Sequence, residues 1–370
     1  MHLHYFLIYF LAIAEGEDYF QFDTRSGDYQ LGPDGTVQYS NLPSWMGTVT
    51  VSTGMTTVNG QVIPRGMQIW TVGTSAYYDI VAAGASGASL FSTVETMLAG
   101  RGIALKTRQY LAAGQQLIIL VGMRPAGCYA DKQSGGGGGT FVSIYAGTGA
   151  FNLKTQHTLL LAAGGGGGVG NFNSYPVVDA VNTKSATKCT GNPTTSVSLN
   201  GGGGGGYSSK GGDGVAGESV SAQYTWRYQG AGGGGAGFLG DGGFGGTNGF
   251  VGVYSSLRSF SFLNGGRGAQ LDATRSSVAC STTSLDPVSR KSRPAGGFGG
   301  GGEGGGISGG GGGGYSGGQG CMPTDPLYAA GHGCGGGGGS YDANSENSYT
   351  TALGSTQCTL CNATLCDKGE

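Results

Sequence analysis

The chain has 370 residues, of which 83 are glycine, about three times the ordinary share, while charged residues make up only 11%. A hydrophobic fraction of 38%, with 10% aromatic residues, excludes plain disorder, because so much apolar surface is available for a packed core. The formal charge of −2 argues against a nucleic-acid partner, which would require a basic surface.

Residues 1–14 have the shape of a secretory signal peptide. Their apolar run of about a dozen residues is too short for a membrane helix of ~20 residues, and Ala12-Ile13-Ala14 forms a small-x-small cleavage site. Two histidines stand where lysine or arginine is usual, so a buried N-terminal strand stays open as the alternative. We expect the chain to be extracellular, either secreted or displayed on the cell surface.

Residues 15–60 are polar and turn-rich, with one alternating stretch at 48–52 that predicts a strand. The denser β pattern begins at 67–72 and 76–83, two β-branched and aromatic runs. Because only Gly73-Thr74-Ser75 separates them, they predict a hairpin. Further strands are expected at 102–111, 116–121, 140–145, 158–163 and 250–254.

Short strands at this spacing predict an antiparallel β-sandwich or jelly roll. The lack of a long 3.6-residue period predicts little α-helix, so the fold class is mainly β. We expect one two-sheet unit that buries Trp70, Ile80, Ile119 and Leu160, because their segments are alternating or wholly apolar.

Runs of consecutive glycines form a second architectural element, at 135–139, 164–168, 201–206, 309–314 and 335–339. They lack the Gly-X-Y period of collagen. An extended threefold glycine helix has a bare backbone on every side, so several such helices can approach and exchange N–H···O=C hydrogen bonds sideways. We predict a bundle of these helices, with Gly203 and Gly311 inside it and Tyr207 and Tyr315 capping it. Flexible glycine-rich loops are the alternative.

Eight cysteines, an even number in a chain expected to be secreted, favour a disulfide framework. Asn362 begins an N-glycosylation sequon, which fits the same compartment. The pairing is not readable from the sequence, but five cysteines lie in the body and three in the tail, so we expect at least one tail cysteine to be mispaired or free. The disulfide candidates are Cys128, Cys189, Cys280, Cys321, Cys334, Cys358, Cys361 and Cys366.

The motifs predict no catalytic residue, no metal ligand and no cofactor. Beyond residues 1–14 only His157 and His332 remain, which are too few for a multi-histidine metal site and leave little to activate a nucleophile. Cys358 and Cys361 have zinc-knuckle spacing, but without a second Cys-x-x-Cys pair they are interpreted as disulfide cysteines. Patterns of the G-x-G-x-x-G type match throughout a chain this rich in glycine, so they carry no information about nucleotides.

The sharpest charge cluster comprises Arg290, Lys291 and Arg293, directly before Pro294. It is a candidate processing site or contact for an acidic partner, but the pattern favours a solvated loop.

A series of landmarks follows in a fixed order along the chain: the strand motifs at 66–72, 78–85 and 117–122, and the glycine motifs at 135–142, 160–168, 296–300 and 309–315. Cys358, Cys361 and Cys366 then have the spacing that opens an EGF-like module. Together these landmarks resemble the glycine-rich extracellular domain of the anaplastic lymphoma kinase and leukocyte tyrosine kinase receptors. The resemblance covers about residues 60 to 366, and it depends on the order of the motifs more than on any single one.

The resemblance implies a tumour-necrosis-factor-like β-sandwich, or jelly roll, with an inserted bundle of polyglycine helices at 61–355, followed at 356–370 by the start of a truncated EGF-like module. It also implies a domain that binds a small protein ligand and supports receptor dimerisation. The parent protein would be a transmembrane receptor tyrosine kinase, and contact with a membrane would come only through a downstream segment.

The sequence departs from that family in three ways. The cysteine expected between Phe298 and Tyr315 is missing, so Cys280 needs another partner, with Cys321 and Cys334 as the candidates. The sequence also stops at Glu370, half-way through the EGF-like module, and the chain as given contains neither the membrane span nor the kinase domain that the resemblance implies. A secreted adhesive or matrix protein that binds glycans or cell surfaces is therefore the competing hypothesis.

Overall fold

The computed structural model describes residues 8–13, 17–22, 27–28, 32–33, 42, 45–53, 57–58, 61–91, 96–125, 127–128, 133–145, 157–170, 179–187, 232–243, 258–269, 295–304, 309–320, 335–344 and 349–352. Throughout this part of the chain the paired strands are antiparallel, and the one helical element is a 3-10 turn, η2 (Phe262–Asn264). The prediction of a mainly β, antiparallel structure is confirmed for these residues.

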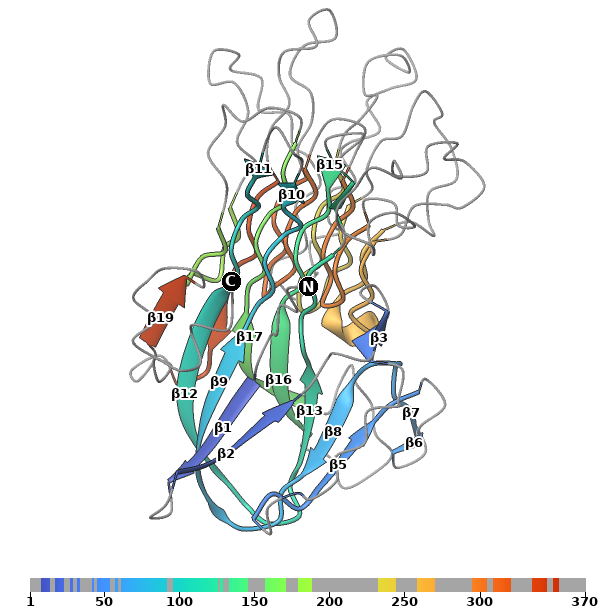
Figure 1. Cartoon of the computed structure of the whole chain (residues 1–370). Coiled ribbons are helices and arrows are strands. Elements are labelled where there is room, and N and C mark those ends of the chain that lie inside the picture. Colours follow the sequence, from blue (N-terminus) through green and yellow to red (C-terminus); the bar gives the residue numbers. More distant parts are fainter. Residues whose placement is uncertain are drawn as a thin grey trace, which may run out of the picture.

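Two large sheets lie in the half of the molecule drawn at the bottom of Figure 1. The first has the order β19 (Tyr349–Ala352), β12 (Ile103–Leu111), β9 (Ala76–Ala83), β1 (Ile8–Ile13) and β2 (Glu17–Phe22). The second has the order β18 (Tyr341–Asp342), β17 (His157–Ala163), β16 (Thr140–Tyr145), β13 (Gln116–Leu120), β8 (Gln68–Thr71) and β5 (Thr48–Val51). Four small two-stranded sheets complete the set: β3 (Gly27–Asp28) with β4 (Gly32–Pro33), β6 (Thr57–Val58) with β7 (Gln61–Val62), β10 (Leu90–Phe91) with β11 (Thr96–Met97), and β14 (Gly127–Cys128) with β15 (Gln133–Ser134).

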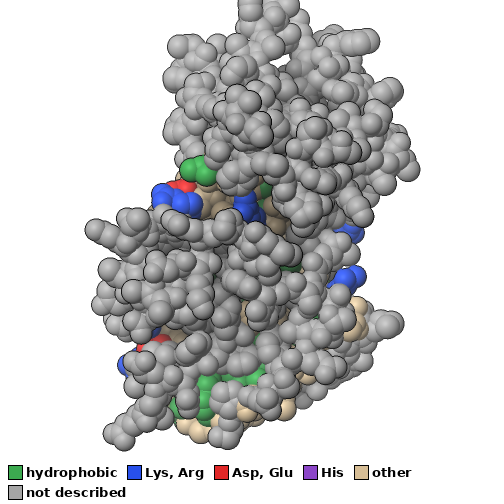
Figure 2. Space-filling model, in the orientation of Figure 1, with side chains coloured by type: hydrophobic (Ala, Val, Ile, Leu, Met, Phe, Trp, Pro, Cys, Tyr) green, Lys and Arg blue, Asp and Glu red, His purple; other side chains and the backbone are tan. Residues whose placement is uncertain are grey.

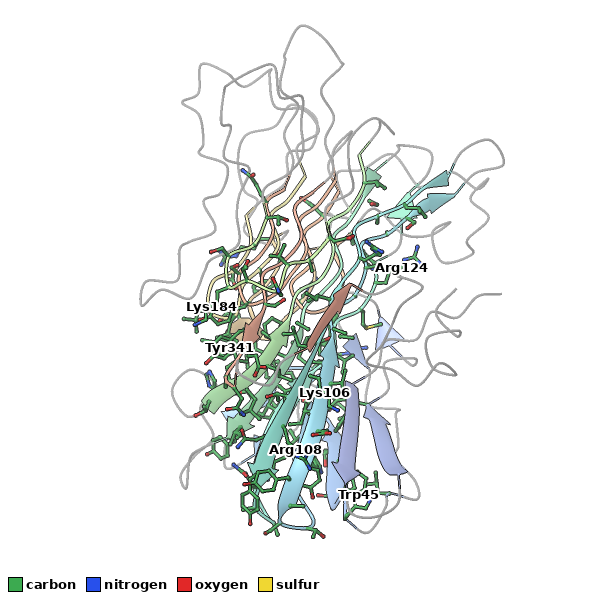
Figure 3. All side chains as sticks on the ribbon, turned by 90° about the vertical axis from the view of Figure 1, so that its left-hand side faces the viewer. Trp45, Lys106, Arg108, Arg124, Lys184 and Tyr341 are labelled. Carbon is green, nitrogen blue, oxygen red and sulfur yellow. The ribbon has the colours of Figure 1, made fainter. Side chains whose placement is uncertain are left out.

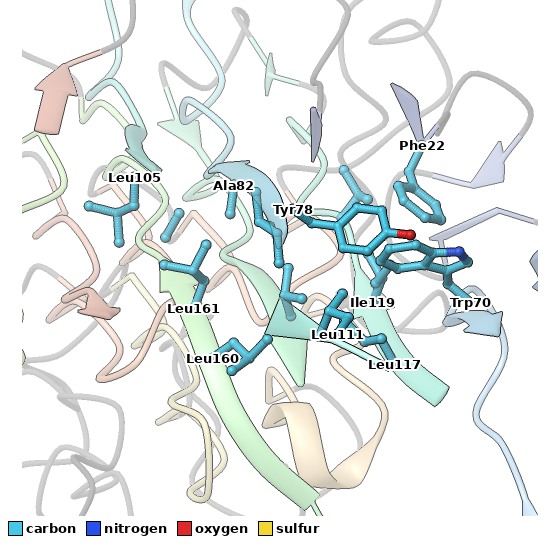
Figure 4. Close-up of a cluster of buried hydrophobic side chains, with 14 of the residues drawn as sticks. Phe22, Trp70, Tyr78, Ala82, Leu105, Leu111, Leu117, Ile119, Leu160 and Leu161 are labelled. Atoms are coloured by element: carbon cyan, nitrogen blue, oxygen red, sulfur yellow. The ribbon is translucent and has the colours of Figure 1, made fainter. Parts of the chain in front are cut away.

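Side chains from both large sheets meet in one hydrophobic core (Figure 4). Trp70, Ile80, Ile119 and Leu160 are at most 3% exposed, so the predicted core is confirmed at all four positions. The Trp70 ring packs edge-on against Tyr78 with the ring centroids 5.3 Å apart. Such an aromatic pair adds about 0.5–1.5 kcal/mol to the stabilisation from buried area alone.

The hairpin predicted across Gly73-Thr74-Ser75 is wrong. β8 pairs with β5 and β13, whereas β9 pairs with β1 and β12, so the connection crosses from one sheet to the other. Gly73 also lacks the positive φ that commonly makes glycine necessary in a turn. Glycine is needed there for a different reason, because a Cβ at Gly73 would lie 2.6 Å from the backbone nitrogen of Gly47.

The apolar segment predicted to belong to a signal peptide forms β1, an inner strand between β2 and β9. Its register places Tyr9 opposite Val81 and Leu11 opposite Asp79. The alternative of an N-terminal strand thus describes the chain as given, while removal of residues 1–14 stays a prediction.

Beyond the ends of the sandwich strands, the glycine runs form a block of extended chains that lies above the sheets in Figure 1. Backbone hydrogen bonds join neighbouring chains, for example from the amides of Gly165 and Gly168 to the carbonyls of Gly313 and Gly310. In the four described runs every added Cβ would lie closer than 3.0 Å to backbone of another segment. The run at 201–206, with Gly203 and Tyr207, lies outside the described residues.

The run 309–314 lies at the centre of this block. Its carbonyls accept hydrogen bonds from three segments, which contain Gly168, Gly302 and Gly318. The amides of residues 310–315 donate to three other segments, and residues three apart donate to the same segment. Gly310 and Gly313 donate to the segment of Ser134 and Gly137. In the same way, Gly311 and Gly314 donate to Gly233 and Ala236, and Gly312 and Tyr315 donate to Gly336 and Gly339.

Thr140 links the two sheets to each other where the sandwich meets the glycine block. This threonine is fully buried. Its hydroxyl donates to the carbonyl of Ala83, at the end of β9, and accepts from the amide of Gly122, just beyond β13. The amides of Ala85 and Ile103, in turn, donate to the carbonyls of Gly138 and Gly164 in the glycine runs, so the sandwich and the glycine block form one hydrogen-bonded body.

The Gly-Gly-Phe-Gly-Gly motif around Phe298 is a buried turn. Gly299 and Gly300 have φ of +99° and +85°, values that favour glycine. The chain reverses there, and the amide of Gly301 donates to the carbonyl of Gly297. Phe298 is 1% exposed and belongs to a second core cluster with Phe141, which anchors the turn to the sandwich.

Replacing Gly311 by alanine is expected to lower the free energy of unfolding by about 2–4 kcal/mol, because the new methyl group collides with backbone that cannot move aside. The matched control is Gly233→Ala, where the nearest atoms to the added Cβ, a Glu303 side-chain carbon and the Gly243 carbonyl oxygen, both lie at 3.2 Å, well beyond the 2.1 Å found at Gly311. We expect this control to stay within about 1 kcal/mol of the parent. Urea unfolding measures both, and equal losses for the two variants would contradict a close-packed block.

Candidate functional site

Two tyrosines stand out on the outer face of the five-stranded sheet. Side chains alternate along β9, so Tyr78 enters the core while Tyr77 points away from it. Tyr77 is 60% exposed and Tyr110 of β12 is 50% exposed, and these residues are directly opposite each other in the register. Their rings form an edge-on pair with centroids 5.3 Å apart. Tyrosine side chains are enriched at protein interfaces, so this exposed pair is a candidate contact surface.

Charged side chains continue the same face next to the tyrosines. Asp79 lies opposite Arg108 in the register, and its carboxylate is 3.0 Å from Nζ of Lys106 and 3.6 Å from Nε of Arg108. The Arg108 guanidinium carbon lies 6.0 Å from the centroid of the Tyr77 ring. One carboxylate thus faces two cations, so the group has a net positive charge. We name Tyr77, Asp79, Lys106, Arg108 and Tyr110 the tyrosine–cation ladder.

Exposure differs sharply within the ladder. The Asp79 side chain is 5% exposed, whereas those of Lys106 and Arg108 are 31% and 50% exposed. Lys106 and Arg108 lie along the sheet face turned toward the viewer in Figure 3. Because the Asp79 carboxylate is buried beneath the two cations, it fixes their positions, and the cations and tyrosines are the groups of the ladder that solvent reaches.

Figure 2 shows hydrophobic side chains gathered at the end of the sandwich remote from the glycine block.

A second group of polar contacts fastens residues 179–187, the strap, to the glycine block. Arg101 makes two side-chain hydrogen bonds to Oδ2 of Asp179, at 2.6 and 3.0 Å, and this contact raises the pKa of the guanidinium. Thr187 and Gly337 exchange hydrogen bonds, and Ser316 donates to the carbonyl of Lys184. These groups satisfy one another, which is the pattern of a structural clamp.

Tyr315, the predicted cap of a six-glycine run, is 3% exposed and stacks on Tyr341 with centroids 4.9 Å apart. Nζ of Lys184 lies 5.1 Å from the Tyr341 ring centroid. Figure 3 shows Lys184 and Tyr341 on the part of the molecule next to the glycine block, away from Arg108. Tyr315 and Tyr341 thus pack together beside the glycine block. Gly311 bonds to neighbouring segments of the block, while its place in a threefold-helix bundle and the capping role of Tyr315 stay predictions.

Most other site residues chosen from the sequence lie outside the described residues. Cys128 lies in β14, opposite Gln133, and nothing beyond its backbone is described. The remaining predicted positions outside the description are Cys189, Cys280, Cys321, Cys334, Cys358, Cys361, Cys366, Asn362, Arg290, Lys291, Arg293, Gly203 and Tyr207. The disulfide, glycosylation and contact-loop hypotheses stay predictions.

Sequence reasoning did not select the tyrosine–cation ladder. Alternation alone places Tyr77 with Asp79 on one face of their strand, and Lys106 with Arg108 and Tyr110 on one face of theirs. The sequence did not reveal that β9 pairs with β12 or in which register, and both decide that the two tyrosines meet.

The described residues contain no group of three or more His, Cys, Asp or Glu placed to hold a metal ion. Nor does this part of the chain include a helix long and apolar enough to cross a membrane. No protein-family model matches the chain, and the search of curated proteins found no match. The function is therefore argued from the fold and from the surface chemistry.

His157 is a half-buried titratable group at the start of β17. Its ring packs edge-on against Phe238, with centroids 5.3 Å apart, and also contacts Phe262. Burial lowers the pKa of His157 below its usual value of about 6.5, because charging the ring in this apolar site is unfavourable.

Since the folded-state pKa of His157 lies below the unfolded-state value, the unfolded chain binds more protons in the window between them. The contribution of His157 to stability is therefore complete above about pH 6.5 and is lost as the pH falls through the folded-state pKa. Urea unfolding of the parent and of His157→Gln at pH 7.5 and at pH 5 measures this contribution. The parent should lose more stability on acidification than the variant, and equal losses would argue against the burial effect.

Proposed function

We propose that this chain is an extracellular ligand-binding domain of the receptor type that its motifs resemble, which binds a small protein ligand and supports dimerisation of its receptor. The observation that carries the proposal is the continuous hydrogen-bonded body formed by sandwich and glycine block, joined where the amides of Ala85 and Ile103 donate to the carbonyls of Gly138 and Gly164. Such a body keeps distant surfaces at fixed positions, and a receptor needs this to transmit ligand binding into a defined pairing of two copies. The tyrosine–cation ladder adds an exposed surface suited to recognition.

The finer fold belongs to the same proposal: a tumour-necrosis-factor-like jelly roll with an inserted bundle of threefold polyglycine helices. The hydrogen bonds of the run 309–314 support it, since residues three apart donate to the same neighbouring segment. A β-strand has a period of two and bonds to two neighbours, whereas a threefold helix presents three sides in turn. Six surrounding segments match the lateral packing of such helices.

Hydrogen exchange resolved to single residues tests this helix geometry. In a threefold helix that is bonded on all sides, the amides of the five consecutive residues 310–314 should all be protected, on a scale of hours, because each has a partner in the block. Protection that alternates along the run would indicate a strand. Exchange at random-coil rates would show flexible loops and remove the bundle from the proposal.

A second candidate function is that of a secreted adhesive or matrix protein that binds glycans or cell surfaces. Tyr77 and Tyr110 favour it, because exposed rings on a rigid sheet suit the apolar faces of sugars. Arraying the purified chain against glycans and cell surfaces tests this candidate, and the absence of any retention would count against it.

The receptor hypothesis makes a direct genetic prediction. Reading frame downstream of Glu370 should encode three more cysteines that complete the EGF-like module, an apolar span of ~20 residues, and a kinase with its Gly-rich loop, His-Arg-Asp and Asp-Phe-Gly motifs. Sequencing a full-length transcript checks this. A stop codon directly after the codon for Glu370 would contradict the receptor hypothesis and leave the adhesive protein as the proposal.

A further inference from the structure

We propose that the tyrosine–cation ladder is a binding site for a uronate-bearing polysaccharide, a sugar chain whose rings carry carboxylates. The inference rests on the proposed extracellular location of the chain, and it names a ligand class for one defined face of the five-stranded sheet. It requires neither a kinase nor a protein ligand, so it applies to both candidate functions.

The tyrosines provide the apolar half of the site. Tyr77 and Tyr110 keep 60% and 50% of their surfaces exposed although each already packs against the other. Cross-strand pairing on two hydrogen-bonded strands fixes their positions, so little conformational entropy is lost when a ligand packs on them. A pyranose presents C–H groups on one face and packs flat against such a ring, leaving its polar groups at the edges for hydrogen bonds.

The cations determine the charge of the ligand. Lys106 and Arg108 share the single carboxylate of Asp79, so among the described side chains of this face one positive charge has no counterion. Arg108 approaches Asp79 through Nε, and its terminal nitrogens make no hydrogen bond to the described residues. A guanidinium with free terminal N–H groups binds a planar carboxylate through two parallel hydrogen bonds. A carboxylate is therefore the best complement to Arg108.

The size of the ladder favours a sugar chain over a protein. From Tyr77 to the position of Lys106 the ladder extends over four residue steps, about 13 Å at ~3.3 Å per residue, and is two strands or about 10 Å wide. This footprint of about 130 Å² is a small part of the ~800 Å² that each partner of a stable protein complex buries. It matches two or three consecutive sugar rings, with an uncharged ring face on the tyrosines and a carboxylate at Arg108.

The test is calorimetric titration of the purified chain with tetragalacturonate, its methyl ester, a dextran sulfate oligosaccharide and a hexaglutamate peptide. We expect tetragalacturonate to bind and the methyl ester, which lacks the charge, to bind at least about tenfold more weakly. Tyr77→Ala and Arg108→Lys should each weaken binding by about fivefold or more, the first by removing a ring and the second by removing the planar fork.

Lys184→Ala is the matched control, because it removes a cation that lies over a tyrosine ring on another part of the molecule. It should leave the affinity unchanged, and unchanged thermal unfolding of every variant excludes loss of fold as the cause of weaker binding. Absence of tetragalacturonate binding, or equal binding of the methyl ester, overturns the proposal. Equal binding of hexaglutamate points to an acidic protein instead, and equal binding of dextran sulfate points to charge attraction alone. None of these outcomes bears on the downstream reading frame, which decides the receptor hypothesis separately.

Discussion

Lateral hydrogen bonds between glycine backbones are the interaction on which the rest of this structure depends. Ordering a glycine costs more backbone entropy than ordering any other residue, so a glycine block is stable only if nearly every amide finds a partner and water is excluded. The run 309–314 meets both conditions, since its residues are buried and bond to segments on all sides. A single side chain in this region would separate two backbones and break several hydrogen bonds together.

This constraint also decides where recognition chemistry is located. A block without side chains offers no charge and no ring to a ligand, so the groups capable of selective contact must lie at its margins or on the sandwich. The strap and the Tyr315–Tyr341 stack occupy the margin, where their polar groups are mutually satisfied. The tyrosine–cation ladder lies on the outer sheet face, and its cations and rings remain half exposed. The tightly bonded backbone and the proposed recognition surface thus lie in different parts of one body.

The sequence was informative wherever local pattern determines structure. Apolar alternation identified the strands and the buried positions of Trp70 and Ile119, and the glycine runs indicated close backbone packing around Gly311. Local pattern misled at Gly73, because a glycine needed for a close approach to Gly47 has the same appearance as a hairpin glycine. The ladder was out of reach because it depends on which strands pair, and strand pairing is a non-local property that a single sequence does not encode in its periodicity.

The two halves of the molecule are coupled through the register of β9 against β12. Just beyond Ala83 the amide of Gly84 donates to the carbonyl of Ile103, and a Cβ at Gly102 would collide with the carbonyl of Gly84. A slip of one residue would bring a side chain into this glycine contact and turn every side chain of β9 to the opposite face. The glycine junction therefore fixes the register along the whole strand pair, and at its far end that register sets Tyr77 opposite Tyr110. The arrangement of the exposed tyrosine–cation ladder is in this sense a consequence of the buried glycine block.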